Sequence, residues 1–135
     1  ERIKGDMIID LATLTGACVV ALGGEYAGLF SNDEELTETL KVAGLAAGEK
    51  SWELPLAAEY RGQMDSEVAD LKNIGNGGPG AILGALFLKE FVPADTPWAH
   101  LDIAGPAFGG RSNEYIRRGA TGYGVLTLLR MLESL

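Results

Sequence analysis

Residues 7–16 read MIIDLATLTG, and this stretch decides the fold class. A near-continuous apolar run bounded by Gly5 and Gly16 is typical of a strand that is buried on both faces in an α/β sheet. The run ends in the hydroxylated residues and glycine of Thr13-Leu14-Thr15-Gly16. Ligands of α/β sheets bind outside the carboxyl ends of the strands, where free backbone groups can hold an extended chain. Residues 13–16 are therefore a candidate binding edge, and an ordinary strand-to-turn transition is the alternative.

The rest of the chain alternates between extended and helical patterns, with no internal repeat and no linker. Strand-like patterns cover residues 18–22, 26–30 and 98–103, and an extended link covers residues 51–55. Helical spacing of apolar residues covers residues 31–48, 56–66, 81–92 and 125–135. Ser31 and Glu34 have capping-box spacing at the start of the first helix, and a polar loop through Arg117 and Arg118 leads to the last one. The alternation predicts a layered α/β domain.

The length of 135 residues suits one domain, and the charge of that domain restricts its partners. Lysine and arginine total 11 against 19 aspartate and glutamate residues, so the net charge is −8. This charge repels phosphate backbones and anionic membrane surfaces, which argues against nucleic acid as a partner. The longest uncharged apolar stretch, residues 11–24, is too short for a membrane helix of about 20 residues. We expect a soluble, cytoplasmic protein, and the single Cys18 fits a reducing compartment.

The composition also predicts that the domain packs against further protein. Glycine contributes 19 of the 135 residues without a repeat, and the mean hydropathy is +0.10 although 22% of the residues are charged. Apolar surface is therefore concentrated in a few segments, and a chain of this length has little interior in which to bury it. We expect part of that surface to be buried against something outside these residues.

Asp10, Asp70 and Asp102 are the candidate chemical groups near the ends of strands. The single His100 and the single Cys18 exclude a metal site built from imidazole or thiolate groups alone. Each carboxylate is interpreted as buried or capping, with backbone N–H groups as its partners, and a metal site would require two or three carboxylates to meet in space. His100 and Asp102 share one face of a strand, but no nucleophile pattern accompanies them. His100 is therefore interpreted as a structural, hydrogen-bonded histidine.

A glycine-rich loop with the sequence GNGGPG (75–80) precedes the helix predicted from residue 81. Helix N-termini attract anions, so the loop is similar to a phosphate cradle. It lacks the Lys-Ser/Thr of a P-loop, and Pro79 removes one amide donor. We interpret the loop as one in which the backbone approaches its neighbours closely, with an anion site as the alternative.

Five segments identify the chain more specifically. They read DLATLTGACVVALG (10–23), ADLKNIG (69–75), GAILGALFLKEFV (80–92), WAHLDIAGPAF (98–108) and GATGYGV (119–125). In this order they resemble the C-terminal part of the catalytic domain of the leucyl aminopeptidase (cytosol aminopeptidase) family. The resemblance implies a three-layer α/β/α sandwich with a mixed sheet. It also implies that residues 1–135 are the C-terminal part of one peptidase catalytic domain, with the N-terminal domain and the metal-ligand segment absent from this chain.

Members of this family are cytoplasmic hexamers that release N-terminal residues from peptides, with a preference for leucine. They use two divalent metal ions, commonly zinc, manganese or magnesium. The family's metal ligands are a lysine, three aspartates and a glutamate, and its catalytic groups are an arginine and a second lysine. None of these positions matches a residue of this sequence, so the resemblance implies no metal ligand and no catalytic residue here. The chain alone is predicted to be inactive.

The residues that the resemblance does carry over belong to a substrate-binding wall. They are Thr13, Leu14, Thr15, Gly16, Ile74, Ala104 and Ala107. Leu14 matches a position whose backbone carbonyl accepts a hydrogen bond from the substrate, Gly16 matches one whose N–H donates to it, and Thr15 lies between them. The pocket for the N-terminal side chain is matched by Thr13, Ala104 and Ala107. Ile74 matches an apolar contact for the following residue.

Two hypotheses follow for the function. The first is a metal-dependent aminopeptidase in which this chain supplies the substrate-binding wall and packing, while the rest of the enzyme holds two metal ions, zinc or manganese. Its partners are peptide substrates and further copies of itself in a hexamer, and neither nucleic acid nor a membrane. The alternative is a non-catalytic, truncated interaction or oligomerisation module. The two hypotheses differ in whether the ligand-bearing part of an enzyme accompanies this segment.

Overall fold

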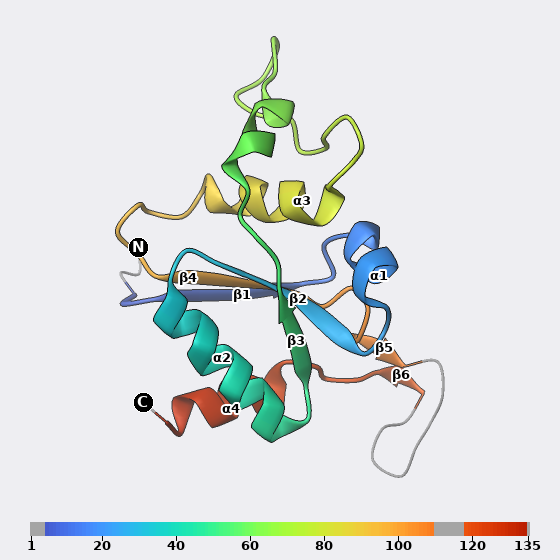
Figure 1. Ribbon diagram of the computed structural model, residues 1–135, viewed down its shortest axis with the longest axis vertical. Coiled ribbons are helices and arrows are strands. Elements are labelled where there is room, and N and C mark those ends of the chain that lie inside the picture. Colours follow the sequence, from blue (N-terminus) through green and yellow to red (C-terminus); the bar gives the residue numbers. More distant parts are fainter. Residues whose placement is uncertain (1–4, 110–117, 135) are drawn as a thin grey trace.

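The computed structural model describes residues 5–109 and 118–134 and contains a four-stranded sheet between two layers of helices (Figure 1). The spatial order of the strands is β1-β4-β2-β3. The strands are β1 (Ile8–Ala12), β2 (Tyr26–Ser31), β3 (Lys50–Glu53) and β4 (Trp98–Asp102). The helices are α1 (Gly16–Leu22), α2 (Glu34–Ala47), α3 (Gly80–Lys89) and α4 (Val125–Leu132), together with the 3₁₀ helix η1 (Ala58–Met64). A separate two-stranded ribbon consists of β5 (Phe108–Gly109) and β6 (Gly119–Ala120).

The sheet is mixed, as the resemblance implied. β1 runs parallel to β4, and Ala12 lies opposite Asp102 at the carboxyl ends of both strands. β2 runs antiparallel to β4 and parallel to β3. A backbone hydrogen bond of 2.9 Å from the Ile103 amide to the Ala12 carbonyl extends the pairing of β1 and β4. The segments that follow these two strands therefore leave the sheet side by side.

The two faces of the sheet carry different side chains, and both faces are covered. Along β4, Ala99 and Leu101 pack with Met131 in the core that α2 and α4 cover. His100 alternates with them and stacks on Phe30, which packs on the opposite face with α1 and α3. Figure 1 shows α2 and α4 on one side of the sheet and α3 with η1 on the other. The predicted three-layer α/β/α arrangement is confirmed.

The prediction of a strand over residues 18–22 is wrong, because these residues belong to helix α1. Thr15 has extended backbone angles, and its hydroxyl accepts a hydrogen bond of 3.0 Å from the Cys18 amide, which caps the helix. Cys18 faces the core with 1% exposure, whereas Val20 points into solvent with 90% exposure. The valines gave the segment a strand-like pattern, but the cap and the burial of Cys18 outweigh that preference.

Helix α2 begins differently from its prediction. Asp33, and not Ser31, is the N-cap, and its carboxylate accepts a hydrogen bond of 2.8 Å from the Leu36 amide. The Ser31 hydroxyl instead donates to the Trp98 carbonyl of β4 at 2.7 Å, so this residue ends β2 and does not open the helix. Gly48 ends α2 in the left-handed conformation, as its position predicted.

Most of the remaining elements agree with the sequence. The strand expected within residues 7–16, the strands predicted over 26–30 and 98–103, the loop over 75–80 and the helix from residue 81 are present within one or two residues. The expected burial of the first strand on both faces is wrong, because β1 lies at the edge of the described sheet and is only half-buried, with Ile8 exposed. The extended link over 51–55 overlaps β3, and the helix predicted over 56–66 is the 3₁₀ helix η1. Arg117 and Leu135, which belong to the predicted loop and the last helix, lie outside the described residues. Within residues 5–109 and 118–134, no helix combines the length and the apolar character that crossing a membrane requires.

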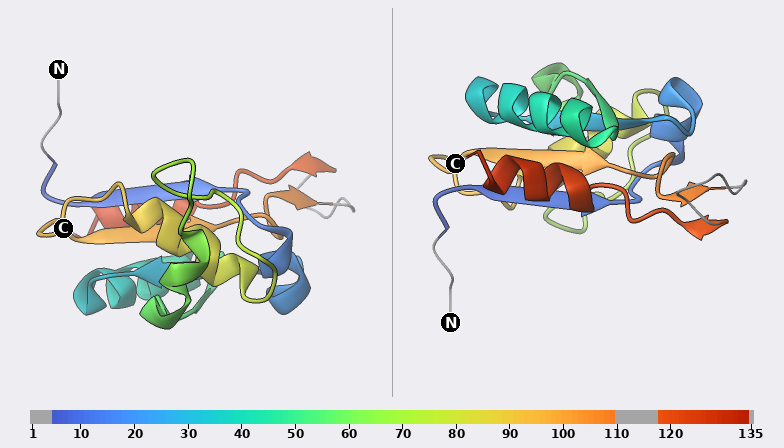
Figure 2. Two further views of the ribbon diagram at one scale, coloured as in Figure 1. Left: turned by 90° about the horizontal axis from the view of Figure 1, so that it is seen from above. Right: turned by 90° about the horizontal axis from the view of Figure 1, so that it is seen from below.

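The outward face of α4 is apolar. Val125, Leu129 and Leu132 recur on it at helical spacing and are exposed, whereas Met131 of the same helix faces the core. Figure 2 shows α4 lying over β1, a strand that pairs only with β4 in the part of the chain that the structure describes. The expected burial against further protein stays a prediction, and the outward face of α4 is the surface to which it applies.

The thiol of Cys18 is expected to react with thiol reagents more slowly in the folded than in the unfolded protein. Burial, and then the nearby charge of Asp102, raise the pKa of this thiol, so less of the reactive thiolate is present at any given pH. Labelling with Ellman's reagent in the native and the urea-unfolded protein measures the difference. We expect the native rate to continue rising with pH where the unfolded rate has levelled off. Equal rates in both states would contradict the described position of Cys18.

Candidate functional site

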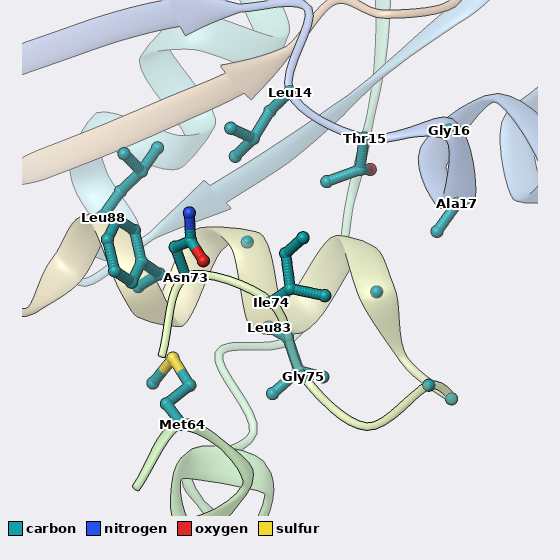
Figure 3. Close-up of a pocket in the computed structure, with 15 residues that line it drawn as sticks. Leu14, Thr15, Gly16, Ala17, Met64, Asn73, Ile74, Gly75, Leu83 and Leu88 are labelled. Carbon is teal, nitrogen blue, oxygen red and sulfur yellow. The ribbon is translucent and has the colours of Figure 1, made fainter. Parts of the chain in front are cut away.

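A cavity of about 510 Å³ opens beside the carboxyl end of β1 (Figure 3). Its walls are residues 14–17 of the loop after β1, one face of α3 and the loop over 73–78, and Met64 of η1 closes one side. Figure 3 shows the Ile74 side chain pointing toward Thr15, and Leu14 next to Leu88 of α3. A concave site lined by apolar side chains and exposed backbone is the usual form of a binding pocket for a small organic group.

Two glycines of α3 bring this helix against the loop after β1. A Cβ atom on Gly84 would lie 2.9 Å from Thr15 Cγ2, and one on Gly80 would lie 2.9 Å from Ala17 Cβ. Because Cβ atoms do not tolerate such distances, the close packing of α3 on the loop requires glycine at both positions.

The glycine-rich loop packs as closely as its sequence predicted. A Cβ atom on Gly75 would lie 2.4 Å from Leu83 Cδ1 of α3. Gly77 and Gly78 have φ values of 97° and 84°, which residues with side chains rarely adopt. The interpretation of residues 75–80 as a close-approach loop is therefore confirmed, and an anion site there stays an untested alternative.

The loop after β1 presents two free backbone groups at the cavity. Within residues 5–109 and 118–134, no group donates a hydrogen bond to the Leu14 carbonyl and none accepts one from the Gly16 amide. Gly16 is the first residue of α1, where helix geometry leaves amide groups without internal partners. Both residues are exposed, so one acceptor and one donor are available to an extended chain.

The carboxylate of Asp102 holds this loop in place. Asp102 Oδ1 accepts hydrogen bonds from the amides of Leu14 at 3.1 Å, Thr15 at 3.4 Å and Ala104 at 3.2 Å, and Oδ2 accepts one of 2.6 Å from the Thr15 hydroxyl. The side chain is fully buried at the end of β4. Its interpretation as a carboxylate paired with backbone N–H groups is confirmed.

The other two candidate carboxylates behave differently. Asp10 pairs with side chains: its Oδ1 lies 2.5 Å from His100 Nδ1, and its Oδ2 accepts a hydrogen bond of 2.7 Å from Trp98 Nε1. The buried His100 is thus hydrogen-bonded, as interpreted, although its Nε2 has no partner among the described residues. Asp70 is exposed on the loop after η1.

The structure brings most of the proposed wall residues to one edge of the sheet. Leu14, Thr15, Gly16 and Ile74 line the same cavity. Ala104 does not line it, but its amide and that of Leu14 bind the same carboxylate oxygen, so the two residues are neighbours.

The other two wall residues lie around this cavity without lining it. Ala107 follows in the next turn, where its amide donates to the Ile103 carbonyl at 3.0 Å and its carbonyl accepts from the Thr121 amide at 3.0 Å. Thr13 is exposed before the loop turns toward α1.

The face of α3 that lines the cavity is the part that sequence reasoning missed. Residues on this face line the cavity: Gly80, Leu83, Gly84, Phe87 and Leu88. Gly80 and Gly84 pack against the loop over 14–17, and Leu83 packs against Gly75 of the loop over 73–78. The spacing of the two glycines, four residues apart within a helical pattern, was the available signal. It marks a helix face on which another segment lies unusually close.

The described residues do not fit a metal ion. No group of three His, Cys, Asp or Glu side chains converges within residues 5–109 and 118–134. Divalent cations require several oxygen or nitrogen donors together, whereas the carboxylate of Asp102 is occupied by four donors and Asp10 is bound to His100 and Trp98. No chemical step through a metal is derived from these residues.

The fold and the cavity together define an α/β domain that can hold an extended chain at the carboxyl ends of parallel strands. The chain belongs to the cytosol aminopeptidase family, whose catalytic-domain model matches residues 1–129.

Two curated relatives illustrate this similarity. The probable cytosol aminopeptidase of Synechococcus sp. (strain JA-3-3Ab) is 55% identical over 129 residues, which are 96% of this chain and 25% of the relative. That of Chlorobaculum tepidum is 54% identical over 133 residues, which are 98% of this chain and 26% of the relative. The chain thus spans about a quarter of the length of the curated relatives it matches.

Solved structures support the same family assignment. A tomato leucine aminopeptidase mutant is 48% identical, with a TM-score of 0.87 over 96% of this chain and 25% of that one. The bottromycin maturation enzyme BotP in complex with Mn is 41% identical, with a TM-score of 0.91 over 99% of this chain and 30% of that one. The α/β fold described above is therefore the fold of this part of those enzymes.

Proposed function

We propose that this chain is the substrate-binding part of the catalytic domain of a metal-dependent aminopeptidase that releases N-terminal residues, preferably leucine, from peptides. The observation that carries the proposal is the pair of free backbone groups, the Leu14 carbonyl and the Gly16 amide, at the mouth of an apolar cavity. A peptide backbone in extended conformation offers both donors and acceptors to such a pair of groups.

In this proposal each wall residue has a separate task. The Leu14 carbonyl accepts from the substrate, the Gly16 amide donates to it, and Thr15 keeps both in register through its bond to Asp102. Thr13, Ala104 and Ala107 border the pocket for the N-terminal side chain. Ile74 contacts the following residue, in keeping with its position in the cavity. Apolar walls exclude water from the bound peptide and strengthen its few hydrogen bonds.

The reactive groups of the proposed enzyme belong to the rest of the longer protein. We propose two divalent metal ions, zinc or manganese, held by residues outside this chain, and they would polarise the scissile peptide group. The manganese in the BotP complex supports a metal-dependent family chemistry. A cytoplasmic hexamer is the proposed assembly. The alternative is a non-catalytic interaction module, and the observation in its support is the exposed apolar face of α4.

The proposal is tested by removing the Gly16 amide in the complete enzyme. Gly16→Pro deletes this donor but suits its surroundings, because proline is favoured at the first position of a helix. The preceding Thr15 already has the extended angles (φ −133°, ψ 136°) that a following proline requires, and a Cβ atom at Gly16 meets nothing within 4 Å. We expect kcat/KM for a leucyl peptide such as Leu-Gly-Gly, whose second residue offers a carbonyl group to this donor, to fall about tenfold to a hundredfold.

Gly16→Ala is the matched control, since it adds the same Cβ and keeps the N–H group. We expect it to retain activity within about threefold, because the Cβ occupies open space. Equal activity of the proline and alanine variants would remove the Gly16 amide from the proposed site. Failure of the complete wild-type enzyme to hydrolyse leucinamide with Mn²⁺ or Zn²⁺ would favour the interaction module.

A further inference from the structure

Asp102 is a fully buried charged side chain to which the proposed reaction gives no chemical role. Burying a carboxylate is costly unless hydrogen bonds replace the lost water. Asp102 has such bonds from four donors, which are three backbone amides and one hydroxyl. These four hydrogen bonds offset the free-energy cost of burying the carboxylate. They also restrict the geometry of every segment that supplies a donor.

The four donors come from the two segments that border the proposed peptide site. The amides of Leu14 and Thr15 and the Thr15 hydroxyl belong to the loop after β1, and the amide of Ala104 belongs to the turn after β4. Leu14 and Ala104 share a single oxygen atom, Oδ1, at 3.1 and 3.2 Å. A movement of either segment away from the other would therefore break a charge-assisted hydrogen bond.

The Thr15 hydroxyl links the Asp102 carboxylate to helix α1. It donates to Asp102 Oδ2 at 2.6 Å and accepts from the Cys18 amide at 3.0 Å, so its hydrogen can point only toward the carboxylate. An ionised carboxylate accepts at both oxygens and suits all four donors. An asparagine amide would offer an NH₂ group where the Thr15 hydroxyl requires an acceptor.

We propose that Asp102 is a positioning residue that fixes the loop binding the peptide backbone relative to the turn that borders the side-chain pocket. This inference rests on the proposed function. Asp102 contacts neither reacting atoms nor substrate, and it acts through the positions of Leu14, Gly16 and Ala104. Its loss misaligns two binding segments at once, so it weakens substrate binding more than it slows the chemical step.

The test compares Asp102→Asn with Asp33→Asn in the complete enzyme. Asp33 is also a carboxylate that accepts from a backbone amide, but it caps α2 away from the cavity. We expect Asp102→Asn to raise KM for Leu-Gly-Gly about tenfold and to change kcat less than about threefold. We expect Asp33→Asn to leave both constants unchanged. Thr15→Val removes the hydroxyl that binds both Asp102 and the Cys18 amide, leaves the three backbone bonds to Asp102 in place, should raise KM in the same direction, and serves if Asp102→Asn fails to fold.

Hydrogen exchange of residues 13–16 and 103–107 provides a readout independent of activity. Asp102→Asn should accelerate exchange in both segments together, while Asp33→Asn should not affect them. The inference is overturned if KM is unchanged, if kcat falls as much as KM rises, or if only one of the two segments exchanges faster. If the wild-type enzyme has no aminopeptidase activity, the proposed function fails, and the exchange data alone still decide whether Asp102 couples the segments.

Discussion

Gly105→Ala is expected to lower the free energy of unfolding by about 3 kcal/mol, the upper part of the usual range for overpacking. A Cβ atom at this position would lie 2.1 Å from the Gly23 carbonyl oxygen and 3.5 Å from Gly24 Cα. The nearest atoms belong to the backbone of the turn between α1 and β2, so no side-chain rotation can relieve the contact. The φ angle of Gly105 is not positive, so the expected loss is a steric effect and not a conformational one.

The matched control for this prediction lies across the same contact. Gly24→Ala would place its Cβ 3.9 Å from the Gly105 carbonyl, which is an ordinary van der Waals distance. We expect a change within about 0.5 kcal/mol for this variant. Thermal unfolding and soluble yield of the complete protein measure both. Similar midpoints for the two alanine variants would show that the turn after β4 is not as close to Gly23 as the structure describes.

Ala104→Phe is expected to reduce kcat/KM for leucyl substrates of the complete enzyme about a hundredfold. Ala104 is half-buried beside the Leu14 loop. In the proposed site its methyl group leaves the room that a branched aliphatic side chain would need. A phenyl ring at this position would fill that room. Glycyl and alanyl substrates present small side chains, so we expect their turnover to fall much less.

The ratio between substrates is the informative quantity for this variant. Ala94→Phe is a suitable control, because Ala94 is exposed in the loop before β4, at the end of the strand away from Ala104. It should leave all substrates unaffected. A uniform loss for leucyl, alanyl and glycyl substrates with Ala104→Phe would indicate misfolding, and the assignment of Ala104 to the pocket would have to be withdrawn.

Local sequence determined the elements whose signal lies within a few neighbouring residues. The apolar run of β4 predicted a buried strand because both faces of the sheet are covered there. The similar run of β1 predicted a strand but not its burial, because β1 lies at the edge of the described sheet and is only half-buried. Gly48 predicted the end of α2 because the left-handed conformation found there strongly favours glycine. In α1 two local signals competed. The β-branched valines predicted a strand, but the Thr15 cap and the burial of Cys18 stabilise a helix.

The candidate site was predictable in part. The small and hydroxylated residues after β1 marked a binding edge, and family resemblance added Ile74, Ala104 and Ala107. That resemblance specified which backbone groups we propose to bind the substrate, and no pattern of side chains reveals these groups. The face of α3 and the loop over 73–78 joined the site only through packing, because their glycines are needed where other segments approach them.

The sequence by itself predicted a mixed α/β sandwich of a known family and the loop at which we propose that the substrate binds. Only the tertiary structure decided that Asp102 holds Leu14, which lies 88 residues away along the chain, and Ala104 on one oxygen atom. The sequence cannot encode this locally, because the partners of a buried carboxylate depend on which strand lies next to it. Here the parallel pairing of β1 with β4 brings the two chain segments together, and the cost of burying the charge makes their hydrogen bonds necessary.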